Sequence, residues 1–339
     1  MSSSLGRRLE RAVDDARLRG WVSRCAYQVS PVRRKDACAV DPGQDVCVRT
    51  IVLASLVWIS IATPASARVR KPLLVAESTS LRVASWNVKR LGHGTKNLKI
   101  VADIINDFDV VAVQEVMTRA AVEALDMNLP DHKVLLTDVA TPQRGSYREY
   151  FAYFYRPSRL TPVMNTFVPD PKDAFLRDPY LGCFVAVGSP MRLCLMTVHI
   201  VFGKRVAVRK TEILALDDAL RWAQKADEAA AWIVLGDFNR PVDDGDSDTD
   251  PEVEWRELLD RRRLREPVVL AGRELPTTLG KSGYANSYDH IFVSIGLYGR
   301  VADAGRVDIV SEACGGSFAR CRGNVSDHAP VFVEIQPWP

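Results

Sequence analysis

The sequence predicts one α/β domain that begins near residue 81 and continues to the C-terminus at residue 339. Short apolar segments of strand length alternate with segments of helical periodicity throughout this region. No internal repeat and no low-complexity linker divides the region, so a second domain is not expected. Polar residues directly follow several of the apolar segments, and strand ends are where α/β sheets carry their function.

Each element is predicted from its own pattern of apolar residues. The residues from Leu98 to Ile105 present one helical face, with Thr95 as the expected cap, and the longest helix is expected from Arg205 to about Glu228. The uninterrupted apolar segment Val110–Val113 indicates a strand that is buried on both faces. Together with that segment, the predicted strands are Leu81–Trp86, Tyr150–Tyr155, Leu193–Ile200, Trp232–Leu235, Ile291–Ser294 and Val331–Ile335.

Composition constrains the way in which this domain can bind a partner. Apolar residues make up 47% of the chain, which is enough for a large core. Residues 1–67 hold ten of the 45 Lys and Arg residues and six of the 42 Asp and Glu residues, so the remainder is nearly neutral. This near-neutrality argues against a broadly basic surface as the main source of affinity for a polyanion, so a nucleic-acid substrate would need a bound cation and a few local basic side chains.

The segment Ile51–Ala62 is the only long apolar stretch in the sequence. Arg49 precedes it, and Pro64 and the small residues Ala65–Ala67 follow it, which is the pattern of a secretory signal peptide with cleavage near Ala67. The stretch is shorter than the roughly 20 residues that a membrane span needs. The alternative, a buried hydrophobic helix, fits poorly with the proline and small residues. The pattern predicts a secreted or periplasmic protein without a stable membrane span.

The position of this signal, residues 48–67, is unusual because residues 1–47 precede it. Those residues are rich in arginine and lack clear periodicity, so we interpret them as a non-native or disordered extension, with translation starting near Val46 or Val48. The alternative is a genuine cytosolic extension. Residues 68–80 are interpreted as a linker to the α/β domain at 81–339.

Four cysteines remain after cleavage: Cys183, Cys194, Cys314 and Cys321. An even number of cysteines in an exported chain indicates disulfides, and pairing between near neighbours is the simplest of the three connectivities. Zinc binding is the competing interpretation, but no CxxC motif or Cys/His cluster accompanies these residues. Two disulfides, Cys183–Cys194 and Cys314–Cys321, are therefore expected.

Polar clusters stand at the ends of three predicted strands. Asn87 ends one strand, Gln114 and Glu115 end the next, and Asp237 and Asn239 end a third. A buried strand that ends in a carboxylate presents oxygen ligands to a hard cation such as Mg²⁺. Each cluster alone also fits an ordinary turn or helix cap. Three clusters in one chain favour a shared site.

Three of the five histidines stand beside acids or strand ends. His199 ends a predicted strand, His290 follows the acid of a YDH motif, and His328 follows the acid of an SDH motif. Two histidines oriented by acids suit in-line attack of water on a phosphodiester, one accepting a proton and the other donating one. His93 and His132 have no such neighbours and are assigned structural roles.

The ordered motifs SWN, QE, SYxE, VH, GDFN, YDH and SDH resemble the endonuclease/exonuclease/phosphatase superfamily over residues 81–337. The segments 144–150 and 175–179 are similar to the deoxyribonuclease I-like branch in particular. His290 is a departure, since deoxyribonuclease I-like chains often carry Arg there and other branches carry His. The fold implied is a four-layer α/β sandwich, with two packed mixed sheets flanked by helices.

The resemblance also implies roles for individual residues in catalysis. Glu115 would be the main metal ligand, with Asn87 close by and Asp327 as a second-site ligand. His199 would pair with Glu149, and His328 with Asp289. Asp237 and Asn239 would position the scissile phosphate, the attacking water or a metal. Mg²⁺ is the expected cofactor, with Mn²⁺ and Ca²⁺ as alternatives.

The implied substrate is nucleic acid, in particular double-stranded DNA, cleaved by a monomer. Tyr147 and Arg177 would contact the backbone and groove, and Lys89 and Arg119 are weaker candidates for phosphate contact. Contacts of this kind would confer shape preference rather than a sequence code.

Three rival functions fit the sequence less well. A phosphatase or sphingomyelinase-like phosphodiesterase shares the outer motifs, but a membrane-acting lipase would show an exposed aromatic hairpin that this sequence lacks. A non-catalytic relative that only binds nucleic acid or protein would need lost ligands, yet every motif residue is present. A cytosolic endonuclease for abasic sites conflicts with the signal segment and the four cysteines.

Overall fold

The computed structural model describes residues 80–142, 147–242, 255, 257–266, 269–270 and 273–336. The chain divides into two units, residues 1–69 and 70–339, and every described residue belongs to the second. The predicted N-terminal extension, signal peptide and most of the linker lie outside the described residues. Among the residues described, no helix combines the length and the apolar character needed to cross a membrane.

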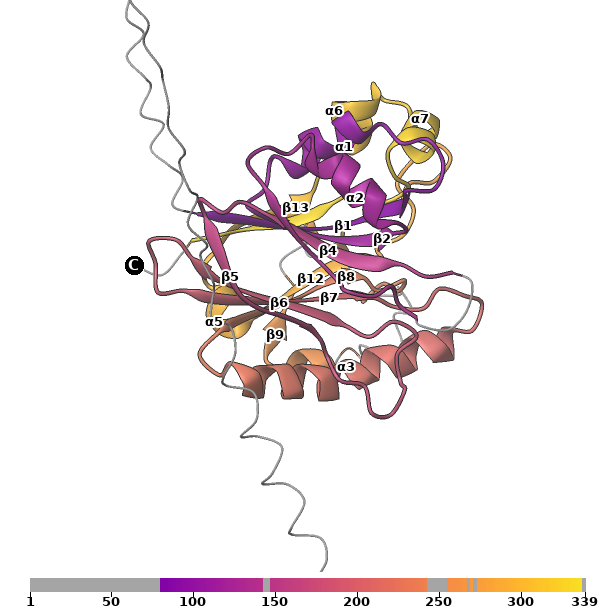
Figure 1. Cartoon of the computed structure of the whole chain (residues 1–339). Coiled ribbons are helices and arrows are strands. Elements are labelled where there is room, and N and C mark those ends of the chain that lie inside the picture. The colour runs from indigo at the N-terminus through magenta and orange to yellow at the C-terminus, as the bar shows by residue number, and fades with distance from the viewer. Residues whose placement is uncertain are drawn as a thin grey trace, which may run out of the picture. The chain divides into compact units, whose positions relative to one another are not determined.

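Two six-stranded sheets form the centre of the second unit (Figure 1). In each sheet one pair of strands is parallel, β1 with β2 and β7 with β8, and the other pairs are antiparallel. In spatial order, the first sheet contains β13 (Val301–Arg306), β14 (Val331–Ile335), β1 (Leu81–Leu91), β2 (Val110–Val116), β4 (Tyr150–Tyr155) and β3 (Lys133–Leu136). The second contains β5 (Leu160–Phe167), β6 (Tyr180–Ala186), β7 (Arg192–His199), β8 (Ala231–Asp237), β12 (Asp289–Ser294) and β9 (Leu264–Arg265).

Helices cover the outer faces of both sheets, which gives the four layers that the family resemblance implied (Figure 1). The first sheet is covered by α1 (Leu98–Ile105), α2 (Arg119–Asp126), α6 (Ile309–Cys314) and α7 (Phe318–Asn324). The second is covered by α3 (Val206–Ala226). Smaller elements are the π-helix η1 (Glu257–Arg261), the short helix α5 (Ile295–Tyr298) and the two-stranded ribbon β10 (Val269–Leu270) with β11 (Arg273–Glu274).

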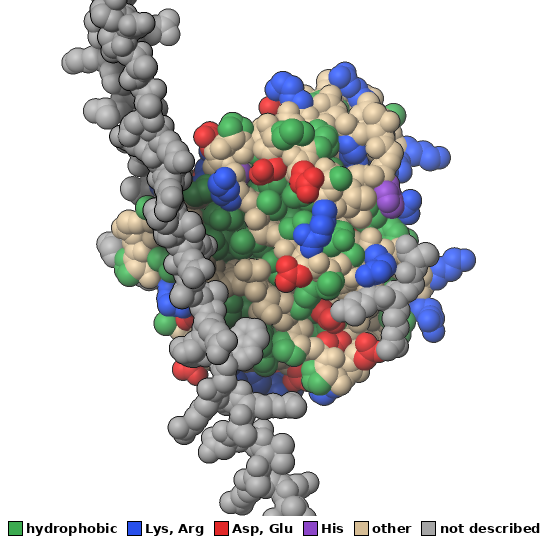
Figure 2. Space-filling model, viewed as in Figure 1, with side chains coloured by type: hydrophobic (Ala, Val, Ile, Leu, Met, Phe, Trp, Pro, Cys, Tyr) green, Lys and Arg blue, Asp and Glu red, His purple; other side chains and the backbone are tan. Residues whose placement is uncertain are grey.

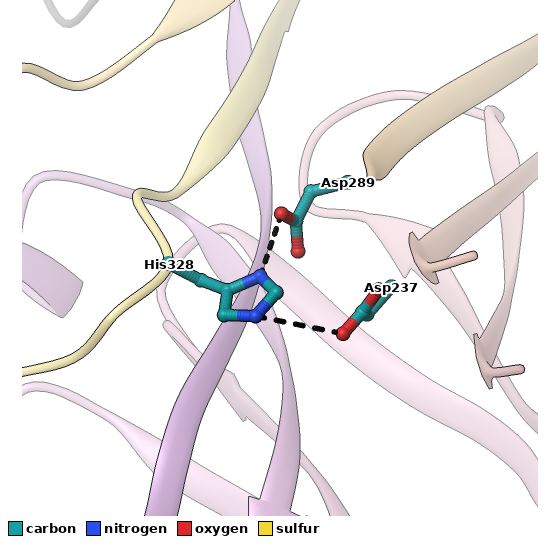
Figure 3. Close-up of side chains that lie close together, drawn as sticks. All are labelled: Asp237, Asp289 and His328. Carbon is teal, nitrogen blue, oxygen red and sulfur yellow. Dashed lines mark hydrogen bonds and ion pairs between the residues drawn. The ribbon is translucent and has the colours of Figure 1, made fainter. Parts of the chain in front are cut away.

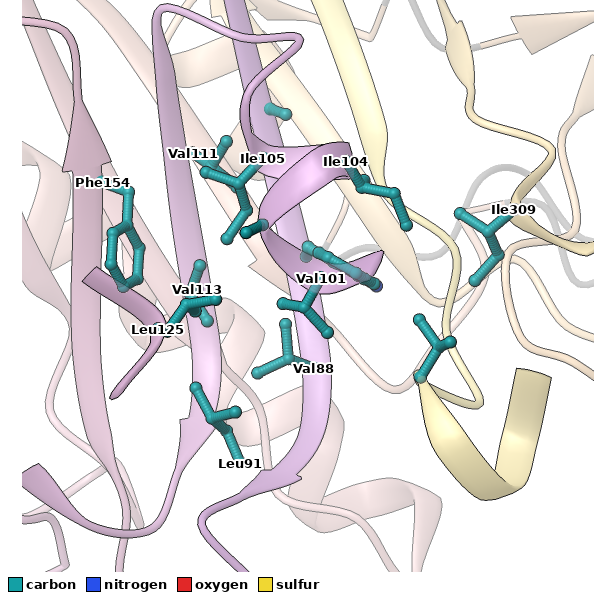
Figure 4. Packing of buried hydrophobic residues seen from close by; sticks show 14 of the residues in the cluster. Val88, Leu91, Val101, Ile104, Ile105, Val111, Val113, Leu125, Phe154 and Ile309 are labelled. Carbon is teal, nitrogen blue, oxygen red and sulfur yellow. The ribbon is translucent and has the colours of Figure 1, made fainter. Parts of the chain in front are cut away.

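Three apolar clusters fill the spaces between these layers. The first lies between the two sheets, the second between the first sheet and its helices, and the third between the second sheet and α3. Figure 4 shows the second cluster, in which Val101 and Ile105 of α1 pack against Val88 of β1 and Val111 of β2. A central strand buried on both faces must be apolar at every position, so β2 begins with the uninterrupted segment Val110–Val113.

The predicted elements are present, with differences at their ends. β1 and β2 extend beyond Trp86 and Val113 into the polar motifs, whereas α3 is slightly shorter than expected. The expected cap at Thr95 is wrong: α1 begins after Asn97, whose side-chain oxygen accepts a hydrogen bond from the backbone N–H of Ile100 at 3.2 Å.

Both expected disulfides are present. Cys183 and Cys194 join neighbouring positions on β6 and β7, and Cys314 and Cys321 join α6 to α7. The second disulfide holds together the two helices that directly precede the SDH motif.

Candidate active site

Strand register brings the predicted polar clusters to one edge of the sandwich. Asn87 lies opposite Gln114 in the parallel pair β1–β2, and His199 lies opposite Asp237 in the parallel pair β7–β8. The carboxyl ends of parallel strands meet at the same edge of a sheet, so four of the predicted positions converge there.

The first histidine–acid couple joins the two sheets. The Nδ1 atom of His199, at the end of β7, lies 2.7 Å from Oε1 of Glu149, just before β4. Both side chains are buried, and Arg177 adds an ion pair to Glu149 at 3.2 Å and a hydrogen bond to the carbonyl oxygen of His199. The ring of His199 is therefore held in one orientation, with Nε2 left to face the site.

The second couple is shown in Figure 3. The Nδ1 atom of His328 donates to Oδ2 of Asp289, the first residue of β12, at 2.8 Å. The hydroxyl of Thr277 donates to the same oxygen at 2.6 Å. The backbone of His328 is also fixed, because its carbonyl oxygen accepts from the indole Nε1 of Trp86 and its N–H donates to Ser326 Oγ.

Asp237 lies between the two couples. Its Oδ2 is 3.6 Å from Nε2 of His199 and 3.8 Å from Nε2 of His328. The same oxygen accepts from Nδ2 of Asn87 at 3.0 Å, and the amide of Asn87 also donates to Glu115 at 3.1 Å. The Nε2 atoms of both histidines therefore face one small space lined by carboxylates.

Two of these residues occupy a strained backbone conformation. Glu115 has φ 59° and Asn239 has φ 52°, which is the left-handed region that side chains other than glycine seldom adopt. Each is held by the site: Glu115 Oε2 accepts from the N–H of Arg90, and Asn239 donates to the carbonyl of Ile200 and to Asp237 Oδ1. Strain of about 1–3 kcal/mol per residue persists where surrounding contacts fix the conformation, as at functional sites.

Burial and neighbouring charges shift the pKa of both histidines and of Asp237. Burial alone would lower the pKa of His328, but Asp289 and Asp237 raise it to about 10. The pKa of His199 is also raised, since Glu149 outweighs the effects of burial and Arg177. Burial raises the pKa of Asp237, and the charge of His328 opposes this only in part.

Glu115 is affected in the opposite direction. Burial would raise its pKa, but the charge of His199 and hydrogen bonds from Asn87 and Tyr147 lower it. Glu115 is therefore a carboxylate that stays ionised at this edge of the sheet, and ionised carboxylates are oxygen donors of the kind that hard cations prefer.

The donor set fits a divalent cation. Ligand atoms of Asp237, Asp289 and His328 lie within 4.8 Å of one another. The Oδ1 atom of Asp289 is buried and accepts no hydrogen bond from a described residue. Carboxylate oxygens and an imidazole nitrogen are ligands that divalent ions bind in proteins. The expected ligand Glu115 adjoins this group through Asn87, whereas the carboxylate of Asp327 is paired with Lys89 at 2.8 Å.

The side chains expected to contact nucleic acid differ in how exposed they are and in whether other residues already engage them. Tyr147 is partly exposed, and the guanidinium of Arg177 lies 5.6 Å from the centre of its ring. Arg177 itself is only 7% exposed and is engaged by Glu149. Arg119 lies apart from both couples, because its guanidinium donates to the carbonyl oxygens of Thr137 and Asp138.

The structure also adds residues that sequence patterns did not reveal. Thr277 and Trp86 support the second couple, and Arg90 donates its N–H to Glu115. None of these contacts has a characteristic spacing in the sequence. His290, although it directly follows Asp289, points elsewhere: its Nδ1 lies 2.6 Å from Glu266 and its Nε2 lies 2.9 Å from the carbonyl oxygen of Arg240. His93 and His132 lie outside both couples, with His93 exposed and His132 bonded to the carbonyl of Phe108.

Comparisons with known proteins agree with this geometry. Residues 84–328 match the Endonuclease/Exonuclease/phosphatase family. A deoxyribonuclease from Thioalkalivibrio sp. (strain K90mix) is 34% identical over 274 residues, which cover 76% of this chain and 72% of that protein. Human deoxyribonuclease-1 is 25% identical over 284 residues, covering 78% of this chain and 95% of that protein.

Solved structures show the same fold at low sequence identity. The human Nocturnin catalytic domain with a bound sulfate anion has a TM-score of 0.56 and 16% identity, covering 76% of this chain and 94% of that one. The fold, the ordered motifs and the relatives agree, and the chain belongs to the endonuclease/exonuclease/phosphatase family, as a hydrolytic enzyme of its deoxyribonuclease I-like branch.

Proposed function

We propose that the protein is an exported, divalent-metal-dependent endonuclease that hydrolyses phosphodiester bonds of double-stranded DNA. One observation carries the proposal: two histidine–acid couples, the buried His199–Glu149 and the partly buried His328–Asp289, direct their Nε2 atoms toward Asp237. A water molecule and a phosphodiester that enter this space would meet a proton acceptor and a proton donor.

The two couples divide the proton transfers. One histidine removes a proton from the attacking water, and the other donates a proton to the leaving 3′-oxygen. Glu149 and Asp289 hold the rings in place and stabilise the imidazolium forms. Asp237 and Asn239 position the water or the phosphate, and the fixed loop that joins them keeps this geometry before the substrate binds.

We assign the metal to Glu115, with Asn87 beside it and Asp327 as a ligand of a second site. The lowered pKa of Glu115 supports this choice, because a carboxylate that stays ionised binds a cation without first losing a proton. A divalent ion there, Mg²⁺ or alternatively Mn²⁺ or Ca²⁺, would neutralise the scissile phosphate and stabilise charge in the transition state.

DNA is favoured as the substrate by the deoxyribonuclease names of the related proteins and by the side chains around the couples. Tyr147 and Lys89 are partly exposed at the site and suit contacts with the sugar–phosphate backbone. Arg177 would contribute indirectly, because its guanidinium forms an ion pair with Glu149 and so helps to fix the partner of His199. The second candidate remains a phosphatase or sphingomyelinase-like phosphodiesterase, which would use the same couples on a smaller phosphoester.

Plasmid cleavage tests the proposal. The purified wild-type chain should nick supercoiled DNA in the presence of Mg²⁺. Nicking should stop when EDTA is added, because EDTA removes the divalent ion. His199→Ala and His328→Ala should each lower the rate by at least about 10². His132→Gln is the matched control, because His132 is buried like His199 but lies outside the couples.

Either of two results would reject the proposal. Near-wild-type cleavage by both folded alanine variants would remove the couples from catalysis. Hydrolysis of sphingomyelin or inositol phosphates in preference to DNA, measured in parallel, would select the second candidate.

Export is supported by the two disulfides and by the signal pattern at residues 48–67. Sequencing the N-terminus of the natural protein tests this part separately. A mature end near Arg68 is expected, and a retained Met1 would contradict export by this signal. A single monomeric species in analytical ultracentrifugation is expected as well.

A further inference from the structure

Arg90 occupies a distorted part of β1 beside the site. The register of β1 against β2 shifts between Asn87 and Leu91. Within this stretch, Lys89 has φ 45° and Arg90 has φ 51°, both in the left-handed region. Their N–H groups donate to Asn87 Oδ1 and Glu115 Oε2, both at 2.9 Å. Bulges next to active sites change the direction of a side chain, and here the site residues themselves hold the irregular backbone.

The side chain of Arg90 is exposed beside the site. Its guanidinium carbon lies 5.5 Å from the centre of the Tyr147 ring, and Arg177 lies 5.6 Å from the same ring. The two arginines differ in their counter-charges. Arg177 is buried against Glu149, whereas the guanidinium of Arg90 has no carboxylate partner or hydrogen bond among the described residues. The neighbouring Lys89 is already paired with Asp327.

This difference matters because the site is rich in carboxylates. A polyanion that approaches Glu115, Asp237 and Asp327 is repelled unless nearby positive charges offset these carboxylates. The main body of the protein is nearly neutral, so its overall charge does not supply that attraction. In the face shown in Figure 2, Lys and Arg side chains gather on the side where α7 and the start of α3 lie in Figure 1. A planar guanidinium that is stacked on an aromatic ring keeps its N–H groups free and pre-oriented for two phosphate oxygens.

We propose that Arg90 is a further substrate-binding residue, which contacts a backbone phosphate of the DNA strand that lies over Tyr147. The inference rests on the proposed nuclease function and deepens it, because it places a phosphate next to the scissile one at the Arg90–Tyr147 stack. Arg90 acts in binding and takes no part in proton transfer.

The test compares Arg90→Gln, Arg90→Lys and Arg82→Gln in the purified protein. Arg82 is the matched control: it also belongs to β1, and its guanidinium also stacks on aromatic rings, at 4.8 Å from Phe108, but it lies near the opposite end of the strand. Steady-state kcat and KM are measured on a short labelled duplex at constant Mg²⁺ over a range of NaCl concentrations. Thermal unfolding of each variant shows whether the fold is intact.

Arg90→Gln should raise KM about tenfold while kcat stays within about twofold of wild type. The slope of log(kcat/KM) against log[NaCl] should become less negative by about 0.9, because one phosphate contact is lost. Arg90→Lys retains the charge and should keep the wild-type slope, with an intermediate KM. Arg82→Gln should change neither quantity.

Two results would overturn the inference. Arg90→Gln with the KM and salt slope of wild type would show that Arg90 touches no phosphate. A fall in kcat with an unchanged slope, in both Arg90 variants, would show that the side chain only supports the backbone around Glu115. A wild-type chain that cleaves no DNA would instead reject the proposed function, so the two failures are distinguishable.

Discussion

Gly236 and Val198 lie opposite each other on β8 and β7, and a Cβ at Gly236 would lie 2.0 Å from the carbonyl oxygen of Val198. Only glycine permits this approach, which sets the register that places His199 opposite Asp237. We expect Gly236→Ala to lower the free energy of unfolding by about 3 kcal/mol or more and to abolish cleavage. Urea unfolding measures the first effect and plasmid nicking the second.

Gly188→Ala is the control for that experiment. Gly188 also has a positive φ, 76°, but no atom lies within 4 Å of the Cβ position. It should cost only about 1 kcal/mol, from backbone strain alone, and leave cleavage unchanged. Equal losses of stability in both variants would contradict the role of the Val198 contact.

The roles of the two histidines can be separated with an activated substrate. A 4-nitrophenyl phosphodiester has a leaving group that departs without a proton, so the variant that lacks the general acid should recover most of its rate on it. Of His199→Ala and His328→Ala, we expect one to recover and the other to remain impaired by about 10² or more. Release of 4-nitrophenolate gives both rates. Equal impairment of both variants on this substrate would contradict a division into one acid and one base.

Asp217 makes the stability of α3 dependent on pH. It accepts hydrogen bonds from Arg221 at 2.5 Å and from Arg262, and despite the burial that opposes ionisation, these partners lower its pKa. A lowered carboxylate pKa stabilises the fold above the unfolded-state pKa, and this stabilisation is lost as pH falls through the folded-state value. We expect Asp217→Asn to cost about 2 kcal/mol at neutral pH.

The pH profile is the check on this interpretation. The difference in unfolding free energy between wild type and Asp217→Asn should shrink as the pH falls below about 4, where the unfolded carboxylate gains its proton. Urea unfolding of both proteins at several pH values measures it. A difference that is constant down to the most acidic condition would show that the carboxylate charge contributes nothing.

The two disulfides are expected to differ in their effect on catalysis. Each closes a short loop, with sequence separations of 11 and 7 residues, so each double Cys→Ser variant should lose about 2–3 kcal/mol of unfolding free energy. Cys314–Cys321 anchors α7, which leads directly into the loop that carries His328, whereas Cys183–Cys194 joins β6 to β7 away from that loop. Below both melting temperatures, only Cys314→Ser/Cys321→Ser should lose activity. Equal activity in the two variants would contradict this difference.

Local patterns accounted for seven of the twelve described strands of the two sheets, all but β3, β5, β6, β9 and β13, and for the chemical identity of most site residues. Continuous apolar segments such as Val110–Val113 predicted buried strands, because a strand covered on both faces has no position for a polar side chain. The cap of α1 was misassigned, since Thr95 and Asn97 are both good caps and the choice depends on where the chain leaves β1.

The alternation of apolar segments was enough to predict the α/β fold class, and the order of the motifs was enough to identify the family; the two histidine–acid pairings followed only from that resemblance. Everything that depends on distance across the two sheets required the folded structure. It brought the Nε2 atoms of His199 and His328 within 4 Å of Asp237 Oδ2, engaged Arg119 and Arg177 internally, and left the charge of Arg90 exposed beside Tyr147. Residues far apart in the sequence become neighbours only when the two sheets pack together. The spacing of residues along the chain therefore does not show which arginine and lysine side chains are neutralised by partners in the folded protein.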